Sequence, residues 1–199
     1  MPNTYTQIYL QIIFATKGRD IKISSNVRDE IEKYICGIFN NKKQKVLAIY
    51  ANPDHLHIFF SYKNLQITIP ELVKTTKIES SNFINDNRLC LGKFNWQEGY
   101  GAFSYSKSQK DKVVNYVLNQ EEHHKKKSFK EEYLALLKAF EIEFKDEYLF
   151  EFYDWLLIIF EKDSTPTECP KSQSNVIPTQ IRFLRNPPTH LKLKENDTN

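Results

Sequence analysis

Residues 52–60 have the sequence Asn52-Pro53-Asp54-His55-Leu56-His57-Ile58-Phe59-Phe60, a turn that leads into a predicted β-strand. Because side chains alternate between the two faces of a strand, His55 and His57 are expected on one face, about 6.5–7 Å apart. Two imidazoles at this separation can bind one metal ion. The opposite face carries the apolar and aromatic side chains of Leu56, Ile58, Phe60 and Tyr62. Such a face is typical of a strand that packs against helices.

A second group of candidate residues lies on a predicted helix from Lys110 to about His123. Tyr116 and Gln120 are four residues apart, so they share one helix face with about 6 Å between their β-carbons. At about 100° per residue they border an apolar sector. That sector consists of Val113, Val114, Val117 and Leu118. A phenol and an amide carbonyl at the edge of a buried face can contribute a nucleophile and a third metal ligand.

The rest of the chain up to about residue 150 predicts strands and helices in alternation. Further strands are expected over residues 5–14, 46–50 and 102–105, the first of them half-buried. Helices are expected from Ser25 or Asn26, from Thr68 to about residue 86, and over 128–140. The order βαββαβ predicts an α+β, ferredoxin-like fold with a four-stranded antiparallel sheet, helices on one face and extra C-terminal helices. In this fold the histidine strand is central.

Composition is typical of a globular protein with one ordinary domain. The 199 residues are 40% hydrophobic and 27% charged, with a formal net charge of +3. We predict a domain over residues 1–150 and a C-terminal extension over 151–199. Residues 164–199 contain many prolines without sustained periodicity, which predicts a largely disordered tail.

Cysteine usage and hydropathy indicate the compartment. Cys36, Cys90 and Cys169 form no Cys-x-x-Cys pair, so neither a zinc site nor a disulfide framework is expected. The N-terminus lacks a signal-peptide pattern, and the longest apolar run, residues 155–160, is too short to span a bilayer. These features predict a soluble, cytoplasmic protein with no membrane partner.

Lysines cluster on both sides of the predicted tyrosine helix. Lys107, Lys110 and Lys112 lie at its start, and Lys125, Lys126 and Lys127 follow it. A single cluster of this kind is usually a solvated surface. Two clusters that flank the proposed site favour a path for phosphates.

Two longer stretches, together with His55-Leu56-His57 and the spacing of Tyr116 and Gln120, resemble a known family. They are Phe94-Asn95-Trp96-Gln97-Glu98-Gly99-Tyr100-Gly101-Ala102-Phe103-Ser104 and Gln120-Glu121-Glu122-His123-His124-Lys125-Lys126-Lys127-Ser128-Phe129. The family is that of the single-tyrosine HUH transposases of the smallest bacterial insertion sequences, which includes the REP-associated tyrosine transposases. The resemblance extends over residues 1 to about 150.

The resemblance implies a function and a set of site residues. Tyr116 would be the catalytic nucleophile, and His55, His57 and Gln120 would hold a divalent metal, Mg²⁺ or Mn²⁺. The substrate would be single-stranded DNA at element ends folded as hairpins, cut through a 5′-phosphotyrosine intermediate. A homodimer with active sites shared between protomers is also implied. Two imidazoles and one amide oxygen should bind Mn²⁺ at least as well as Mg²⁺.

Several alternatives stay open at the level of sequence. The chain can be a domesticated relative that acts on dispersed palindromic repeats, a non-catalytic single-stranded nucleic-acid-binding module, or a metal-dependent nuclease that uses water. Asp54 is expected to be a turn residue, with a ligand role as the alternative. His124 is expected to complement the dipole at a helix C-terminus. His123 is an outside candidate for the site, and Tyr105 is a fallback nucleophile.

Overall fold

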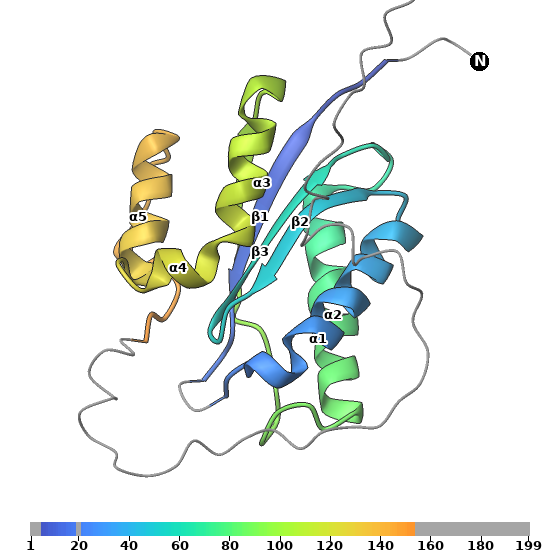
Figure 1. The fold of residues 1–199 in the computed structure, drawn as a ribbon, viewed down its shortest axis with the longest axis vertical. Helices are drawn as coiled ribbons and strands as arrows, with labels where there is room; N and C mark the ends of the chain where they lie inside the picture. Colours follow the sequence, from blue (N-terminus) through green and yellow to red (C-terminus); the bar gives the residue numbers. More distant parts are fainter. Residues whose placement is uncertain (1–4, 19–20, 154–199) are drawn as a thin grey trace, which may run out of the picture.

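The computed structural model describes residues 5–18 and 21–153, and Figure 1 shows a mixed sheet-and-helix domain. Its strands are β1 (Tyr9–Ala15), β2 (Lys45–Ala51), β3 (His55–Ser61) and β4 (Gly101–Tyr105). Its helices are α1 (Ser25–Asn41), α2 (Ile69–Asp86), α3 (Lys110–Leu118), α4 (Gln120–His124) and α5 (Phe129–Ala139), with short 3₁₀ turns η1 (Lys107–Gln109) and η2 (Asp146–Tyr148). The predicted C-terminal extension lies almost entirely outside the described residues.

The four strands form one antiparallel sheet in the order β2-β3-β1-β4. This order, reached through βαββαβ connectivity, confirms the predicted ferredoxin-like fold. β3 pairs with both β1 and β2, so the histidine strand is central, as predicted. In the register, His57 lies opposite Ile13 of β1 and Tyr50 of β2. The site therefore lies on the most constrained part of the sheet.

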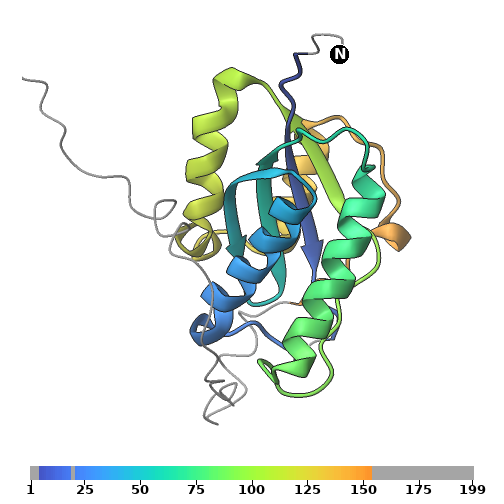
Figure 2. The same ribbon diagram turned by 90° about the vertical axis from the view of Figure 1, so that its right-hand side faces the viewer.

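Helices α1 and α2 cover one face of the sheet (Figure 2). The predicted start of α2 is confirmed, because Thr68 caps the helix by accepting the backbone N–H of Glu71, with a proline in the first turn. Between these helices and the sheet lies a core that includes Leu56, Ile58 and Phe60 of β3, all fully buried. Burial of this apolar face fixes the register of β3 and directs the histidines to the opposite face.

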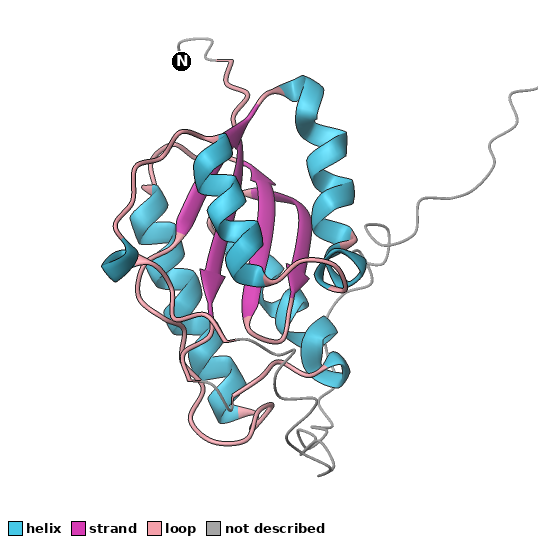
Figure 3. Ribbon diagram, turned by 90° about the vertical axis from the view of Figure 1, so that its left-hand side faces the viewer, coloured by secondary structure: helices cyan, strands magenta, loops and turns pink. Residues whose placement is uncertain are grey.

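The additional helices α3, α4 and α5 lie on the histidine side of the sheet (Figure 3). Val113 and Val117 of α3 pack with Tyr50 and Phe59 in a second apolar cluster. Both faces of β1 are therefore buried, and the prediction of a half-buried first strand is wrong. Gln11 and the tyrosines alternate with aliphatic residues, which predicts one polar face, but α3 covers that face and buries it. The strand itself begins at Tyr9 rather than at residue 5.

The predicted single helix from Lys110 to His123 is also wrong. α3 ends at Leu118, and Asn119 adopts φ −101° and ψ 25° before α4 begins at Gln120. Asn119 satisfies the helix end locally, because its side-chain Nδ2 and its backbone N–H both donate to the carbonyl of Asn115. Figure 1 shows α4 turned away from the α3 axis. Tyr116 and Gln120 consequently belong to different helices.

None of the helices in the described part of the chain combines the length and apolar character needed to cross a bilayer.

Gly101 of β4 allows α5 to pack closely on the sheet. A β-carbon at this position would lie 2.9 Å from the rings of Phe103 and Tyr133. We expect Gly101→Ala to lower the free energy of unfolding by about 1–3 kcal/mol, because the added methyl group overpacks this contact. Urea denaturation measures the effect.

Gly37 provides the matched control within α1. A β-carbon there would meet nothing within 4 Å. Gly37→Ala should therefore raise stability by about 0.5–1 kcal/mol, because alanine restricts the unfolded chain in a helix interior. Equal effects of the two substitutions would contradict close packing of α5 on β4.

Candidate active site

His55 and His57 lie side by side on the buried face of β3, with their ring centroids 5.0 Å apart. The Phe129 ring of α5 stacks on His55 at 3.8 Å between centroids and 7° between planes. The side-by-side placement predicted from residue alternation is confirmed by the structure. The helix that covers the pair was predicted as a helix but not as part of the site.

Asp54 and Asn52 bind opposite ends of the His55 ring. His55 Nδ1 donates to Asp54 Oδ1 at 2.7 Å, and Asn52 Nδ2 donates to His55 Nε2 at 2.9 Å. Burial lowers the pKa of His55 to about 4, although Asp54 acts in the opposite direction. His55 is therefore neutral near pH 7, which is the form that binds metals. Asp54 orients a histidine, a role beyond that of a turn residue.

Gln11 of β1 connects His57 to Tyr105 of β4. Its amide nitrogen lies 2.8 Å from His57 Nδ1, and its amide oxygen accepts the hydroxyl of Tyr105 at 2.7 Å. Burial and the Glu132 carboxylate raise the pKa of the Tyr105 phenol far above its usual range. Tyr105 thus supports Gln11, and the only sign of this role in the sequence is a polar residue, Gln11, within a buried strand.

Glu132 of α5 is the central residue that the sequence analysis missed. The carboxylate is almost fully buried, and its Oε1 accepts the Tyr116 hydroxyl and the Gln120 Nε2, the latter at 2.9 Å. Its Oε2 lies 3.7 Å from His55 Nε2 and 3.4 Å from His57 Nε2. Burial raises the pKa of Glu132, but the surrounding histidines outweigh this and hold it well below its usual range.

A signal for Glu132 was present in the helix pattern. Glu132 lies three residues after Phe129 and next to Tyr133, on the buried face of α5. A carboxylate on such a face requires partners, because burying an unpaired charge is costly. Only an identified set of partners would have distinguished Glu132 from the neighbouring exposed Glu131.

Tyr116 lies at the edge of this cluster, with its ring centroid 6.0 Å from that of His57. Burial, followed by the charge of Glu132, raises the pKa of the phenol far above its usual range. The Tyr116 hydroxyl is therefore protonated and hydrogen-bonded to Glu132 in this structure. Tyr116 and the histidines belong to the same chain, so the arrangement here is complete within one protomer.

Gln120 is fully buried despite the break between α3 and α4. Its Oε1 accepts Asn52 Nδ2 at 3.4 Å, while its nitrogen donates to Glu132. Tyr116 and Gln120 thus meet at Glu132, although they do not share a helix. Tyr116 and Gln120 are therefore neighbours because both donate to Glu132 Oε1, and not because of their spacing along one helix.

His123 and His124 of α4 both face Glu132. His124 Nε2 lies 3.3 Å from Glu132 Oε2 and 3.0 Å from His55 Nε2. His124 lies in the last turn of α4, the position expected for a residue that complements the helix dipole, and it also contacts the site. The His123 Nε2 lies 3.5 Å from Glu132 Oε1, and its ring centroid is 5.4 Å from that of Tyr116. The location of His123 at the site agrees with its status as an outside candidate.

The side chains of this site fit a metal ion. One ligand atom from each of His55, His57, His124 and Glu132 lies within 4.8 Å of the others. Buried His57 Nε2 and Glu132 Oε2 have no hydrogen-bond partner in the described part of the protein. A cation between them would satisfy both atoms, since buried polar groups otherwise carry a desolvation cost. This His-rich, Glu-containing group could bind a metal ion.

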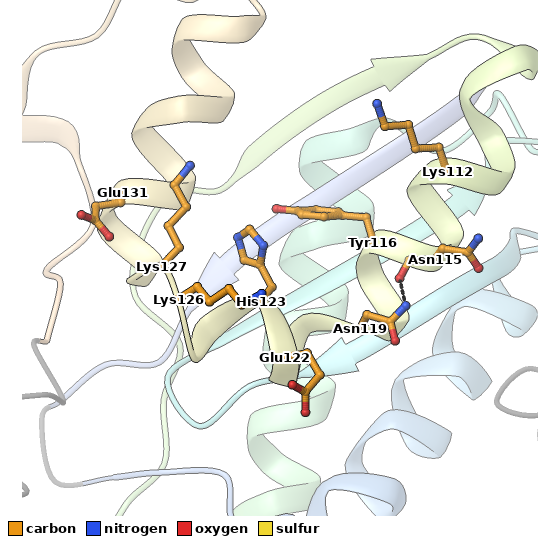
Figure 4. A pocket seen from close by; sticks show the side chains of 9 residues that line it. All are labelled: Lys112, Asn115, Tyr116, Asn119, Glu122, His123, Lys126, Lys127 and Glu131. Atoms are coloured by element: carbon orange, nitrogen blue, oxygen red, sulfur yellow. Dashed lines mark hydrogen bonds between the residues drawn. The ribbon is translucent and has the colours of Figure 1, made fainter.

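A cavity of about 910 Å³ opens beside Tyr116 (Figure 4). Three of the six predicted DNA-binding lysines line it, namely Lys112, Lys126 and Lys127. The other three do not line it, and Lys110 and Lys125 form ion pairs with Asp111 and Glu122. Figure 4 shows Tyr116 and His123 pointing toward each other between Lys112 and Lys127. Glu122 and Glu131 also line the cavity, so three lysines and two carboxylates surround the open face that leads to the phenol.

The fold and the site together define a class: a ferredoxin-like domain with a histidine–carboxylate cluster beside a half-buried tyrosine and a lysine-lined cavity. The family model described as "Transposase IS200 like" matches residues 4–120 of this chain. The chain belongs to this transposase family. The resemblance inferred from the sequence motifs is confirmed.

Two solved structures are similar to this chain. One is a protein of Deinococcus radiodurans R1 described as a transposase, with 20% identity, a TM-score of 0.47, and coverage of 60% of this chain and 95% of that one. The other is a REP-associated tyrosine transposase bound to a REP hairpin, with 11% identity, a TM-score of 0.48, and coverage of 62% and 73%. No curated protein matches the chain. The family assignment rests on the family model.

The hydrogen bonds from Tyr105 through Gln11 to His57 should contribute measurably to the free energy of unfolding. We expect Gln11→Leu to lower the free energy of unfolding by about 1–3 kcal/mol, because it leaves two buried polar groups unpaired. Tyr105→Phe should cost less, and the double variant should cost less than the sum. Urea denaturation of the metal-free protein gives the three values. Strict additivity would show that these hydrogen bonds contribute nothing, and Tyr148→Phe, at an exposed position, serves as the control.

Proposed function

We propose that this transposase cuts and rejoins single-stranded DNA at hairpin-marked ends through a covalent 5′-phosphotyrosine intermediate on Tyr116. The observation that carries the proposal is the placement of the Tyr116 hydroxyl between the histidine–carboxylate cluster and a lysine-lined cavity. A nucleophile, a potential metal centre and a phosphate-attracting surface meet at one place. Family membership supplies the reaction class, and the geometry supports the role of each residue.

His55 and His57 are proposed to hold a divalent metal, Mg²⁺ or Mn²⁺, with Gln120 as the third ligand expected from the sequence. When bound, such an ion stabilises negative charge on the phosphate oxygens. Lys112, Lys126 and Lys127 are proposed to attract the DNA backbone to the cavity.

The residues of the chain account for the covalent chemistry. The Tyr116 oxygen attacks the phosphorus and gives up its phenolic proton, the bond from phosphorus to the departing 3′-oxygen breaks, and that oxygen takes up a proton. The products are a 5′-phosphotyrosine and a 3′-hydroxyl. A phenol leaves more readily than a sugar alcohol, since its pKa is near 10. A free 3′-hydroxyl can therefore reverse the attack, and rejoining needs no ATP.

The test uses labelled single-stranded DNA from the ends of the element, incubated with purified protein and Mn²⁺ or Mg²⁺. We expect a DNA–protein adduct on a denaturing protein gel. Tyr116→Phe should abolish the adduct, because phenylalanine has no nucleophilic oxygen. Chelation of the metal and His57→Ala should lower its yield by about 100-fold or more.

Two further samples sharpen the result. Tyr105→Phe should retain the adduct, whereas its loss there alone would make Tyr105 the nucleophile. An equimolar mixture of Tyr116→Phe and His57→Ala should form no adduct if each site is complete within one chain. Cleavage by Tyr116→Phe without an adduct would favour a nuclease that uses water.

The lysines of the cavity yield a separate prediction about binding. Single alanine substitutions of Lys112, Lys126 or Lys127 should weaken binding of single-stranded DNA and reduce the slope of log K against log salt by about 0.7 each. Fluorescence anisotropy over a range of salt concentrations measures both. Lys125→Ala is the matched control, because Lys125 pairs with Glu122 and does not line the cavity. An equal loss of DNA affinity in Lys125→Ala would contradict the proposal that the DNA backbone follows the lysines of the cavity.

A further inference from the structure

We propose that the metal centre of this protein is a four-donor site of three histidines and one glutamate, in which His124 and Glu132 join His55 and His57, and Gln120 is a positioning residue. This inference revises the ligand set of the proposed function. It also places two ligands beyond residue 120, where the match to the family model ends.

In the neutral rings of His55 and His124 the Nε2 atoms carry the lone pairs, and the lone pair of His55 accepts the Asn52 amide, a contact that a bound metal ion would replace. His55 Nδ1 faces the Asp54 carboxylate at 2.7 Å, and His124 Nδ1 faces the backbone carbonyl of Lys127 at 2.9 Å. Both partners are acceptors, so both Nδ1 atoms carry the hydrogen in the neutral rings. The two Nε2 atoms lie only 3.0 Å apart. A cation beside both atoms would take up the two lone pairs, in place of the Asn52 amide at His55.

The other two donors face the same place. Glu132 Oε2 lies 3.3 Å from His124 Nε2 and 3.4 Å from His57 Nε2. His57 Nε2 can ligate a metal when the hydrogen of the ring is on Nδ1. In that tautomer Nδ1 donates a hydrogen bond, so the Gln11 amide must turn its oxygen toward it. The Tyr105 hydroxyl can either donate or accept, so it supports both orientations of Gln11. The hydrogen bonds from Tyr105 through Gln11 are therefore compatible with a His57 imidazole that binds a metal through Nε2.

Gln120 is already engaged at both ends of its amide. Its nitrogen donates to Glu132 Oε1 at 2.9 Å, and its oxygen accepts Asn52 Nδ2. An amide nitrogen has no lone pair for a metal. Gln120 therefore orients the carboxylate and leaves Glu132 Oε2 directed at the histidines, as second-layer partners do in metal sites.

The donor chemistry indicates the kind of ion. Three imidazoles and one carboxylate favour Zn²⁺, Mn²⁺ and similar transition ions, whereas Mg²⁺ prefers oxygen ligands and retains water. One carboxylate also leaves the centre with a net positive charge beside the phosphate path. We expect Zn²⁺ and Mn²⁺ to bind much more tightly than Mg²⁺.

Isothermal titration of Zn²⁺ and Mn²⁺ into the metal-free, full-length protein without DNA tests the ligand set. His124→Ala and Glu132→Gln should each weaken binding by about 100-fold or more, and Gln120→Ala by about tenfold, the effect of an outer partner. Glu131→Gln is the matched control on the same helix, since glutamine preserves its capping box. The control should bind metal as the wild type does.

The reverse ranking would overturn the inference: a loss of about 100-fold in Gln120→Ala with less than tenfold in His124→Ala would make Gln120 the third ligand. Wild-type protein provides a measurement that needs no variant to fold. In ¹⁵N spectra of the imidazoles, Zn²⁺ should shift the Nε2 resonances of His55, His57 and His124. An unshifted His124 would also overturn the inference.

The outcomes are separable from those of the proposed function. Metal binding is measured without DNA, so loss of the Tyr116 adduct would leave the titrations unaffected. Conversely, an adduct that persists in His124→Ala with unchanged Zn²⁺ affinity would refute the ligand set and leave Tyr116 as the nucleophile.

Discussion

The buried Glu132 carboxylate is the feature on which the arrangement of the site depends. An ionised group this deep is costly unless hydrogen-bond donors or groups that can carry positive charge surround it. Its Oε1 accepts hydrogen bonds from Tyr116 of α3 and Gln120 of α4. Its Oε2 faces the imidazoles of His124 in α4 and His57 in β3. The requirement to neutralise one charge thus brings together the nucleophile and the candidate metal ligands.

The sheet holds in place the histidines that face the Glu132 carboxylate. β3 is paired on both sides, and its apolar face is fully buried against α1 and α2, so its histidines have little freedom to shift. α5 reaches the other face because Gly101 leaves room for Tyr133, and Phe129 then stacks on His55. Glu132 lies between these two contacts in the helix. Its position is therefore set by packing on both sides.

The polar partners of the histidines give the site its chemical character. Asp54 and Gln11 hold the outer nitrogens of His55 and His57, so the inner nitrogens face Glu132. Asp54 already holds His55 in the tautomer that binds a metal, whereas the Gln11 amide has to turn for His57 to do the same. Burial, and after it the Glu132 carboxylate, raises the pKa of Tyr116. Neutralisation of its charge by an ion would make the phenol easier to activate, which connects the metal centre to the proposed chemistry.

The sequence determined the local features of this protein. Alternation in residues 55–60 placed His55 and His57 on one face, the caps and apolar periods located α1, α2 and α5, and the element order predicted the ferredoxin-like sheet. Tertiary structure alone decided that Gln11, His124 and Glu132 meet at the histidines. Spacing along one element is a local property, whereas a contact between β1, β3, α4 and α5 depends on how all four pack. No pattern within a single segment specifies which buried polar groups will share one charge.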